Sequence, residues 1–390
     1  MARSTDDLRI YAAVDLDAVA ANMAVIRAKL PVGVKIMGVV KADGYGHGAV
    51  ETAETILRNG AEQLGVACCE EGVSLRNAGV TAPVLILGYT PPGCFPEVVG
   101  YGLTQTVYNA AGAGKLSEAA LGQGKTAAVH IKIDTGMGRL GFLPDTESVR
   151  AVKAICALPG LRVEGVYTHY AVADSAAEED MAFTRAQYGK FLQFINALEA
   201  NGVRIPLAHA ANSGAVLNHA KTVSDMARVG LLTYGLVPDG ADAAGFKPVM
   251  RLIAKVVSVK QPGPGASVGY GRTYVADKQT KIATVSAGYA DGYPRYLSNK
   301  GRVIINGEYA AVAGAICMDH FMADVTHIKH VAEGDEAVLI GSAGDKSVTA
   351  DEVAALGGTI NYEIVCGVGK RVPRVYRGNA AGIAGGLFFK

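Results

Sequence analysis

The sequence predicts an α/β protein in which a (β/α)8 barrel of the TIM type is followed by a smaller, mostly β domain. Two observations favour this fold class. Up to residue 248, short apolar runs alternate with helical segments, as they do in successive βα units. From Met250 onward helical periodicity becomes rare, and strand-like runs are separated by turn residues instead. We therefore expect two domains, residues 1–248 and 249–390, with residues 1–12 as the segment that could pack with the second domain.

The length and composition agree with this plan and argue against several classes of protein. A chain of 390 residues is long enough for two or three domains with a substantial core. Its 37 lysines and arginines and 36 aspartates and glutamates leave almost no net charge, which argues against binding to nucleic acid or to an anionic membrane surface. The start of the chain is polar, without the apolar region of a signal peptide, and no run reaches the ~18 apolar residues of a membrane span. The six cysteines show no CxxC pair and no metal-site spacing, so we expect a cytoplasmic protein with reduced thiols and no metal.

Eight segments in the first range are strand candidates, and the first of them is nearly all apolar and short, as a strand buried on both faces would be. They are Val34–Val40, Leu64–Cys68, Pro83–Leu87, Thr104–Tyr108, Ala127–Asp134, Arg162–His169, Leu207–Ala211 and Ala227–Thr233. The clearest helix is Phe183–Ala200, where Phe191 and Leu192 are among the residues expected on one apolar face. A second helix, Asp15–Leu30, precedes the first strand.

The second range predicts strands that are joined by tight turns. Its strand candidates are Leu252–Val259, Lys281–Val285, Arg302–Ile305, Tyr309–Ala313 and Ala337–Ile340. Asn306 and Gly307, between the third and fourth of these, are typical of the two-residue turn of a β-hairpin. One helix is expected near Ala350–Leu356.

Polar residues that could carry chemistry lie at the ends of the predicted barrel strands. Lys41 ends the first strand, and the glycine-rich segment Gly44–Gly48 follows it. The others end or follow later strands: His169, Asn212-Ser213 and Arg228-Gly230. Active sites of such barrels lie at the C-terminal ends of the strands, so we expect these residues to form one pocket that presents an amine.

These segments resemble the motifs of a known family. The sequence VVKADGYGHG around Lys41 is similar to the lysine motif of the alanine racemases, which bind pyridoxal 5'-phosphate (PLP). The resemblance continues in the order of the family through HIKIDTGMGRLG, THYAVAD, HAANSGA, ARVGLLTYG, VGYGRTY, SAGYADGYPR, ICMDHFMADVT and GKRVPRVY. It implies the barrel-plus-β fold and a homodimer whose active sites are shared between subunits. It also implies two-base racemisation of L-alanine to D-alanine, which supplies peptidoglycan synthesis.

The resemblance assigns the residues that bind the cofactor. Lys41 matches the lysine that forms a Schiff base with PLP. The residues that match phosphate-binding positions are Tyr45, Ser213, Gly230, Leu231 and Tyr376. Asn212 and Ser213 fit the cap of a helix equally well, but phosphate binding after strands seven and eight of such barrels favours a cofactor role. Arg228 matches the arginine that faces the pyridine nitrogen, where a permanent cation disfavours protonation of the ring.

The resemblance also assigns the residues that act in catalysis. Racemisation needs a base on each face of Cα, and Lys41 and Tyr270 match these two bases, the tyrosine acting in the site of the partner subunit. A free tyrosine has a pKa near ~10, so a tyrosine base needs help from its neighbours. His169 matches the histidine that links this tyrosine to Arg228. His47 is part of the lysine motif, but we assign it no chemical role.

Four residues match the positions that contact substrate. Arg139 matches the arginine that holds the substrate carboxylate, for which a planar guanidinium is well suited. Tyr289, Met318 and Asp319 match positions on the partner's side of the site and at its entrance.

Lys132 is expected inside the barrel. Strand alternation places it on the same face as Asp134 and on the face opposite Ile131 and Ile133. An unpaired ammonium there would be costly, particularly near Arg139. We expect it to pair with Asp134 or another carboxylate, to become neutral, or to be carbamylated by CO2, as the matching lysine is in some alanine racemases.

Other classes of protein share parts of this pattern. A noncatalytic PLP carrier of the same barrel type is shorter and lacks the β domain. A PLP decarboxylase of the ornithine or diaminopimelate type has both domains, but commonly an acidic residue where Arg228 stands. Serine-preferring and broad-specificity racemases stay as alternatives. The polar N-terminus argues against the broad-specificity type, which is often exported, and Tyr376 argues against the serine type.

Overall fold

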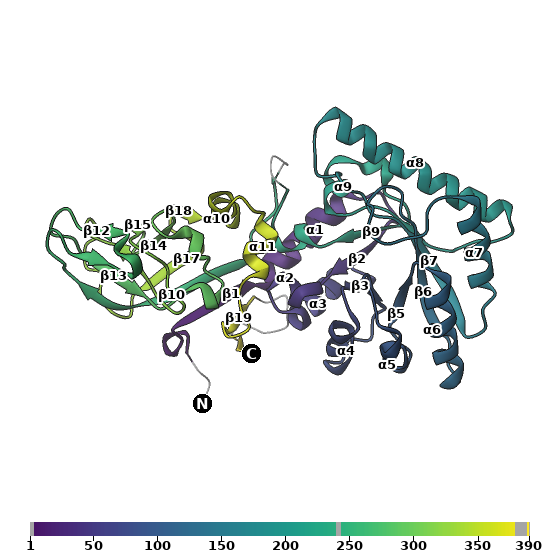
Figure 1. Cartoon of the computed structure of the whole chain (residues 1–390), viewed down its shortest axis with the longest axis horizontal. Helices are drawn as coiled ribbons and strands as arrows, with labels where there is room; N and C mark the ends of the chain where they lie inside the picture. Colours follow the sequence, from purple (N-terminus) through teal and green to yellow (C-terminus); the bar gives the residue numbers. More distant parts are fainter. Residues whose placement is uncertain (1–3, 239–242, 379–387, 390) are drawn as a thin grey trace. The chain divides into compact units, whose positions relative to one another are not determined.

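The computed structural model describes residues 4–238, 243–378 and 388–389 (Figure 1). Contacts between Cα atoms divide the chain into two compact units. The barrel unit consists of Val19–Gly44 and Ala49–Lys247, and the β unit consists of Met1–Ala18, Tyr45–Gly48 and Pro248–Lys390. The β unit thus includes two short segments from the N-terminal part of the chain. A single boundary between residues 248 and 249 stays a prediction.

The barrel unit contains eight parallel strands in the order β8-β7-β6-β5-β4-β3-β2-β9. They are β2 (Lys35–Val39), β3 (Gln63–Val66), β4 (Val84–Ile86), β5 (Thr104–Val107), β6 (Ala127–Lys132), β7 (Leu161–Tyr167), β8 (Ala208–His209) and β9 (Met226–Val229). The amide of Asp225 donates to the carbonyl of Ala208 (2.9 Å) and the amide of Arg228 donates to that of Ala211 (3.0 Å). These bonds join the first and last strands of the order, so the predicted barrel is confirmed.

Helices alternate with these strands, and Figure 1 shows α4 to α8 along the outside of the strands. The helices in this part of the chain are α1 (Leu16–Lys29), α2 (Lys41–Tyr45), α3 (Ala49–Arg58), α4 (Cys69–Asn77), α5 (Phe95–Gly100), α6 (Ala110–Gly122), α7 (Thr146–Cys156), α8 (Glu178–Ala200) and α9 (Ser213–Asn218). Phe191 of α8 is fully buried, but Leu192 is 40% exposed. The prediction for Leu192 is therefore wrong, because a turn of ~100° per residue moves it out of the apolar stripe. Within the described ranges, no helix combines the length and the apolar character that crossing a membrane requires.

The β unit is built on a ten-stranded sheet in the order β18-β17-β14-β15-β16-β13-β10-β1-β19-β20, and β10 also pairs with β17. The strands are β1 (Ile10–Asp15), β10 (Met250–Lys260), β13 (Ile282–Val285), β14 (Arg302–Ile305), β15 (Glu308–Val312), β16 (Phe321–Asp324), β17 (Glu336–Ala343), β18 (Lys346–Val348), β19 (Arg374–Arg377) and β20 (Phe388–Phe389). A small hairpin, β11 (Ser267–Val268) and β12 (Tyr274–Val275), and two helices, α10 (Ala350–Gly357) and α11 (Asn361–Cys366), complete it. Strand β1 pairs antiparallel with β10 and parallel with β19, so the start of the chain belongs to this sheet.

The predicted hairpin between β14 and β15 is confirmed. Ile305 pairs with Glu308, and Asn306 and Gly307 between them have φ angles of 50° and 78°. Two successive residues with positive φ define the type I′ turn, whose twist matches that of the flanking strands. The local sequence alone therefore determines this connection.

Replacing Gly307 with alanine should lower the free energy of unfolding by about 1 kcal/mol, because a Cβ atom disfavours this φ. Gly263→Ala is the matched control. A Cβ atom would have open space at both positions, but Gly263 is not among the residues with positive φ. Urea unfolding followed by circular dichroism should show a lower midpoint for Gly307→Ala alone, and equal midpoints would contradict the argument.

Candidate active site

The centre of the barrel unit is occupied by a buried arginine. Arg228 lies in β9 and is 4% exposed. Its Nη2 donates hydrogen bonds to the carbonyls of Thr168 (2.8 Å) and Ala210 (2.9 Å). The guanidinium also donates to Nδ1 of His169 (3.0 Å) and to Nδ1 of His209 (2.9 Å). Burial lowers the pKa of Arg228 to about 10, so it stays a cation at neutral pH although these acceptors carry no charge.

The hydrogen bonds of Arg228 determine the tautomers of the histidines around it. A guanidinium can only donate, so Nδ1 of His209 accepts and the ring hydrogen lies on Nε2. This Nε2 in turn donates to Nδ1 of His130 at 2.9 Å. Burial, and after it the charge of Arg228, lowers the pKa of His130 to about 4 and the pKa values of His169 and His209 well below the usual range. All three imidazoles are therefore neutral at pH 7.

Two of these histidines received no role from the sequence. His209 stacks on the ring of Tyr167, with centroids 4.7 Å apart. The ring of His130 lies against Gly165, where a Cβ atom would approach it within 2.7 Å. In strand β6, the alternation that places Lys132 inside the barrel also places His130 there, so it could have identified His130 as a residue of the site. For His209, the motif HAANSGA was the only signal.

Lys132 is buried beside this network, as the alternation of strand β6 predicts. It is 5% exposed, and its Nζ lies 4.5 Å from the centroid of the Tyr167 ring. Burial lowers the pKa of Lys132 to about 7, the charges of Arg228 and Arg139 lower it further, and Asp134 opposes them. A pKa near neutrality leaves a large share of the amines unprotonated under physiological conditions.

Asp134 is occupied by main-chain amides and forms no ion pair with Lys132 in the described part of the chain. Its Oδ1 accepts from the amides of Gly136 (2.9 Å) and Gly138 (3.0 Å), and its Oδ2 accepts from the amide of Arg139 (2.9 Å). The carboxylate therefore shapes the loop that carries Arg139. The expected pairing of Lys132 with Asp134 is wrong, because the carboxylate oxygens are directed to this loop.

Lys41 is followed by a strained turn at the end of β2. Ala42, Asp43 and Gly44 have φ angles of 53°, 53° and 61°, which form a left-handed helical turn. The left-handed helix costs an L-residue roughly 1–2 kcal/mol, and such strain is concentrated at functional sites. The amide of Ala42 donates to Oε1 of Glu71 at 2.6 Å, which supports the turn.

The barrel unit brings five of the predicted residues into one electrostatic cluster. After burial and the charge of Arg228, the charges of Lys41 and Arg139 lower the pKa values of both Lys132 and His169. This cluster is rich in cations, and its histidine is neutral. Such a site favours a ligand that carries negative groups.

The predicted phosphate-binding residues of the barrel unit also lie together. Ser213 Oγ accepts a hydrogen bond from the amide of Gly230 (3.2 Å), which joins the start of α9 to the 3-10 helix η4 (Leu231–Tyr234). Oδ1 of Asn212 accepts from the amide of Ala215 (3.0 Å), so the capping role of Asn212 is confirmed. A hydroxyl and main-chain amides at two helix starts are the donors that phosphate groups prefer.

The β unit carries other predicted residues on exposed loops. Tyr270 is 69% exposed and borders a hollow of about 750 Å³. Tyr289 is 41% exposed, and its amide donates to the carbonyl of Cys317 (3.1 Å), directly before Met318 and Asp319. The structure thus brings Tyr289 beside Met318 and Asp319. Tyr270 and His169 belong to different units, so the link between them stays a prediction.

Tyr45 and Tyr376 also belong to the β unit. Gly48 leaves space for the hydroxyl of Tyr376, because a Cβ atom there would collide with it. Nδ1 of His47 is hydrogen-bonded to the carbonyl of Tyr45 at 2.9 Å. His47, which had no predicted role, therefore stabilises the turn that carries Tyr45.

Comparisons with known proteins identify the family of this chain. Residues 14–238 match the family model "Alanine racemase, N-terminal domain", and residues 249–376 match "Alanine racemase, C-terminal domain". The alanine racemase of Clostridium perfringens is 46% identical over 373 residues, which cover 95% of this chain and 96% of that protein. The solved alanine racemase structure from Clostridium difficile 630 shares 37% identity with a TM-score of 0.91 and covers 98% of this chain and 97% of its own. That from Streptomyces lavendulae shares 38% identity with a TM-score of 0.90 and covers 95% and 97%. The chain therefore belongs to the alanine racemase family.

Proposed function

We propose that this protein racemises L-alanine to D-alanine with PLP and two bases, and so supplies D-alanine for peptidoglycan. The observation that carries the proposal is Arg228, a buried cation held by uncharged acceptors in a chain of the alanine racemase family. A decarboxylase of the same fold commonly has an acidic group at this position, which favours a proton on the pyridine nitrogen. Arg228 favours the opposite state of the ring, so we favour the racemase.

The residues of the barrel unit fit PLP. The hydroxyl of Ser213 and the amides near Gly230 suit its phosphate, and the amine of Lys41 suits covalent attachment. When bound, the cofactor withdraws electrons from the Cα atom of the amino acid and makes its proton acidic. Arg228 faces the ring nitrogen in this proposal and keeps it unprotonated, because a proton there would place two positive charges in contact. Three further phosphate positions rest on the resemblance: Tyr45, Leu231 and Tyr376.

Two side chains move the protons in this proposal. Nζ of Lys41 takes the proton from one face of Cα, Oη of Tyr270 delivers one to the other face, and the roles exchange in the reverse direction. His169 accepts from Arg228 at Nδ1, so its hydrogen lies on Nε2 and is available to stabilise a deprotonated tyrosine base. The guanidinium of Arg139 binds the substrate carboxylate through two parallel hydrogen bonds.

We further propose that Lys132 is carbamylated. Its pKa of about 7 supplies a neutral amine, whose Nζ bonds to the carbon of CO2 and releases one proton. The product is an anion in a cluster that contains Arg139 and Arg228, and it can orient Arg139 toward substrate. It also replaces the counter-charge that Asp134 does not provide, because Asp134 is directed to main-chain amides.

The chain is proposed to form a homodimer whose active sites contain residues from both copies. Tyr270 and Met318 are 69% and 52% exposed in the single chain, and a base needs a site from which water is excluded. A second copy placed against Tyr289 and Met318 would complete the entrance and leave Asp319 at its rim. The cytoplasmic location stays a prediction from the sequence.

The first test concerns the two bases. Lys41→Ala and Tyr270→Phe should each lower racemase activity about 1,000-fold or more, because each removes one proton-transfer group. A mixture of the two variants should regain activity, because one site of the mixed dimer contains Lys41 from one copy and Tyr270 from the other. D-alanine formation is measured with a coupled D-amino-acid oxidase assay.

The control establishes the attachment site and the subunit exchange. Borohydride reduction of Tyr270→Phe followed by peptide mapping should place the pyridoxyl group on Lys41. Exchange is followed with differently tagged copies. If exchange is complete and no activity returns, each site lies within one chain.

The second test concerns Arg228. Arg228→Glu should slow racemisation about 100-fold and raise the share of turnovers that end in transamination, because a carboxylate favours the protonated ring. Pyruvate formed per turnover measures this share. Arg228→Lys is the matched control, because it keeps the positive charge and should form little pyruvate. A Glu variant that is as fast and as clean as the parent protein would show that Arg228 does not face the ring nitrogen.

The third test concerns Lys132. Lys132→Ala should lower activity roughly tenfold, because the carbamate that orients Arg139 is then lost. Acetate, a short carboxylate, should partly restore the activity. In the parent protein under ¹³CO2, a carbamate carbon signal should decrease as the pH falls below about 7, because only the neutral amine reacts. The signal should be lost in Lys132→Ala and kept in Lys153→Ala, which changes an exposed lysine. A parent protein without the signal would rule out carbamylation.

A further inference from the structure

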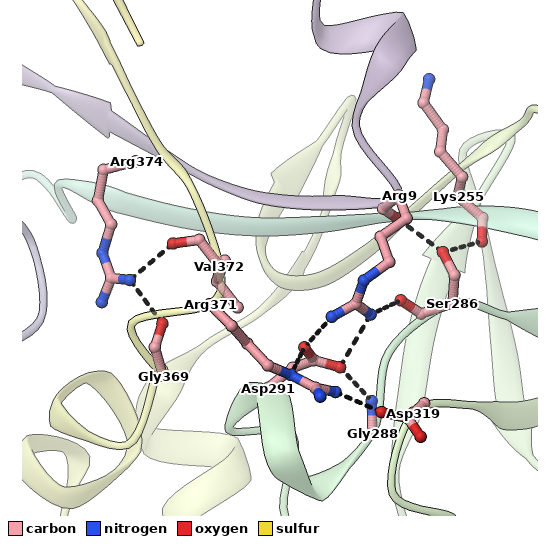
Figure 2. Close-up of polar contacts among 10 residues, drawn as sticks. All are labelled: Arg9, Lys255, Ser286, Gly288, Asp291, Asp319, Gly369, Arg371, Val372 and Arg374. Atoms are coloured by element: carbon pink, nitrogen blue, oxygen red, sulfur yellow. Dashed lines mark hydrogen bonds and ion pairs between the residues drawn. The ribbon is translucent and has the colours of Figure 1, made fainter. Parts of the chain in front are cut away.

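The β unit contains a chain of four charged side chains whose signs alternate (Figure 2). The side chain of Asp291 is fully buried. Its carboxylate accepts hydrogen bonds from both Nη atoms of Arg9 and from Nε of Arg371 (2.8 Å). Nη2 of Arg371 also donates to Oδ1 of Asp319 at 2.6 Å. Two cations therefore balance two anions. Burial would raise the pKa of Asp291, but the hydrogen bonds of the two arginines hold this pKa below its usual value, so Asp291 is charged at neutral pH.

Asp291 also holds the loop that carries Tyr289. Its Oδ2 accepts from the amide of Gly288 at 3.0 Å, and Arg9 donates to the carbonyl of Ser286 at 3.0 Å. The loop is thereby tied at its start and at its end. The carboxylate is fully buried, so water does not compete for its oxygens, whereas the side chains of Arg9 and Arg371 are 42% and 41% exposed.

The same loop packs directly on the segment that carries Met318. The amide of Ala290 donates to the carbonyl of Met318 at 3.1 Å, beside the bond from Tyr289 to Cys317. Gly288 permits this approach, because a Cβ atom there would collide with the carbonyls of Cys317 and Met318. Arg371 therefore bridges the two adjacent segments through their carboxylates.

Asp319 is one end of this charge chain, and both ends reach solvent, since the side chain of Arg9 is 42% exposed. The side chain of Asp319 is 50% exposed, next to Met318, whereas the side chain of Asp291 at the other contact of Arg371 is 0% exposed. A bare carboxylate at this point would repel an incoming carboxylate, because repulsion between like charges acts over the ~8–10 Å of the Debye length at moderate salt.

We propose that Arg371, held in place by the buried Asp291, masks the charge of Asp319 and so sets the affinity of the entrance for an anionic substrate group. This proposal rests on the proposed function, since Tyr289, Met318 and Asp319 are substrate positions there. Arg371 acts through Asp319 and is a positioning residue. The substrate class follows from the charge: the entrance binds a free carboxylate more tightly while the Arg371–Asp319 pair is neutral as a whole.

The test separates charge from structure. Arg371→Gln should raise KM for alanine about five- to tenfold at low salt and change kcat less than twofold, because only the approach of the carboxylate is affected. At 1 M salt, where the Debye length is ~3 Å, the rise should shrink to about twofold or less. Arg371→Lys keeps the charge and should leave KM within about twofold of the parent value.

A double-mutant cycle tests the role of Asp319. In an Asp319→Asn background, Arg371→Gln should change KM less than about twofold, because no carboxylate remains to be masked. Arg302→Gln is the matched control. It removes the arginine of another bidentate pair in the same unit, Arg302 with Glu352 (2.7 and 3.0 Å), and should leave KM unchanged at every salt concentration.

The outcomes distinguish this proposal from the proposed function. A parent protein without alanine racemase activity would overturn the function itself. If the parent is active, a KM rise that is independent of salt, or equal in Arg371→Gln and Arg371→Lys, or kept in the Asp319→Asn background, overturns the masking role. If Arg371→Gln does not fold, Arg371→Lys tests the masking role by itself. A KM within about twofold of the parent value supports masking by charge, and a rise above about fivefold contradicts it.

Discussion

A buried guanidinium among uncharged acceptors determines the chemistry of the barrel unit. An unpaired cation in a protein interior is costly, and the structure offsets this cost with hydrogen bonds from Arg228 to two carbonyls and two imidazoles. Because the carbonyls belong to the barrel main chain, the guanidinium is held by the fold itself. Because the imidazoles must accept, His169 and His209 are neutral and carry their hydrogens on Nε2.

In the β unit, the buried charge of Asp291 has charged partners instead of uncharged ones. Asp291 is surrounded by Arg9, Arg371 and a main-chain amide, so its charge is compensated within the chain. Removing either arginine would leave the buried carboxylate of Asp291 less compensated, and this loss would be destabilising. In the barrel unit, by contrast, Arg228 donates hydrogen bonds to uncharged acceptors, two carbonyls and two imidazoles. The β unit thus uses a buried charge to hold a loop, whereas the proposed function gives the buried charge of the barrel unit a role in binding.

Local sequence determined the elements and the position of the main site residues. The alternation of strand-like and helix-like segments predicted the eight barrel strands, because such patterns are properties of a few neighbouring positions. The turn at Asn306-Gly307 followed from the preference of these residues for positive φ. Lys41 and Arg228 were predicted as site residues because the ends of barrel strands carry the chemistry and because their motifs resemble those of the alanine racemases.

Tertiary structure alone decided how these residues are paired. The sequence offered Asp134 as the partner of Lys132, but the oxygens of Asp134 are directed to three amides of the Arg139 loop. The bond from His209 to His130 joins two strands, and the tie of Arg9 to Asp291 joins the first strand segment to a distant loop. Such pairings depend on distances between residues far apart in the chain and on the exclusion of water around them. Neither quantity is encoded in a local pattern, so only the folded chain defines them.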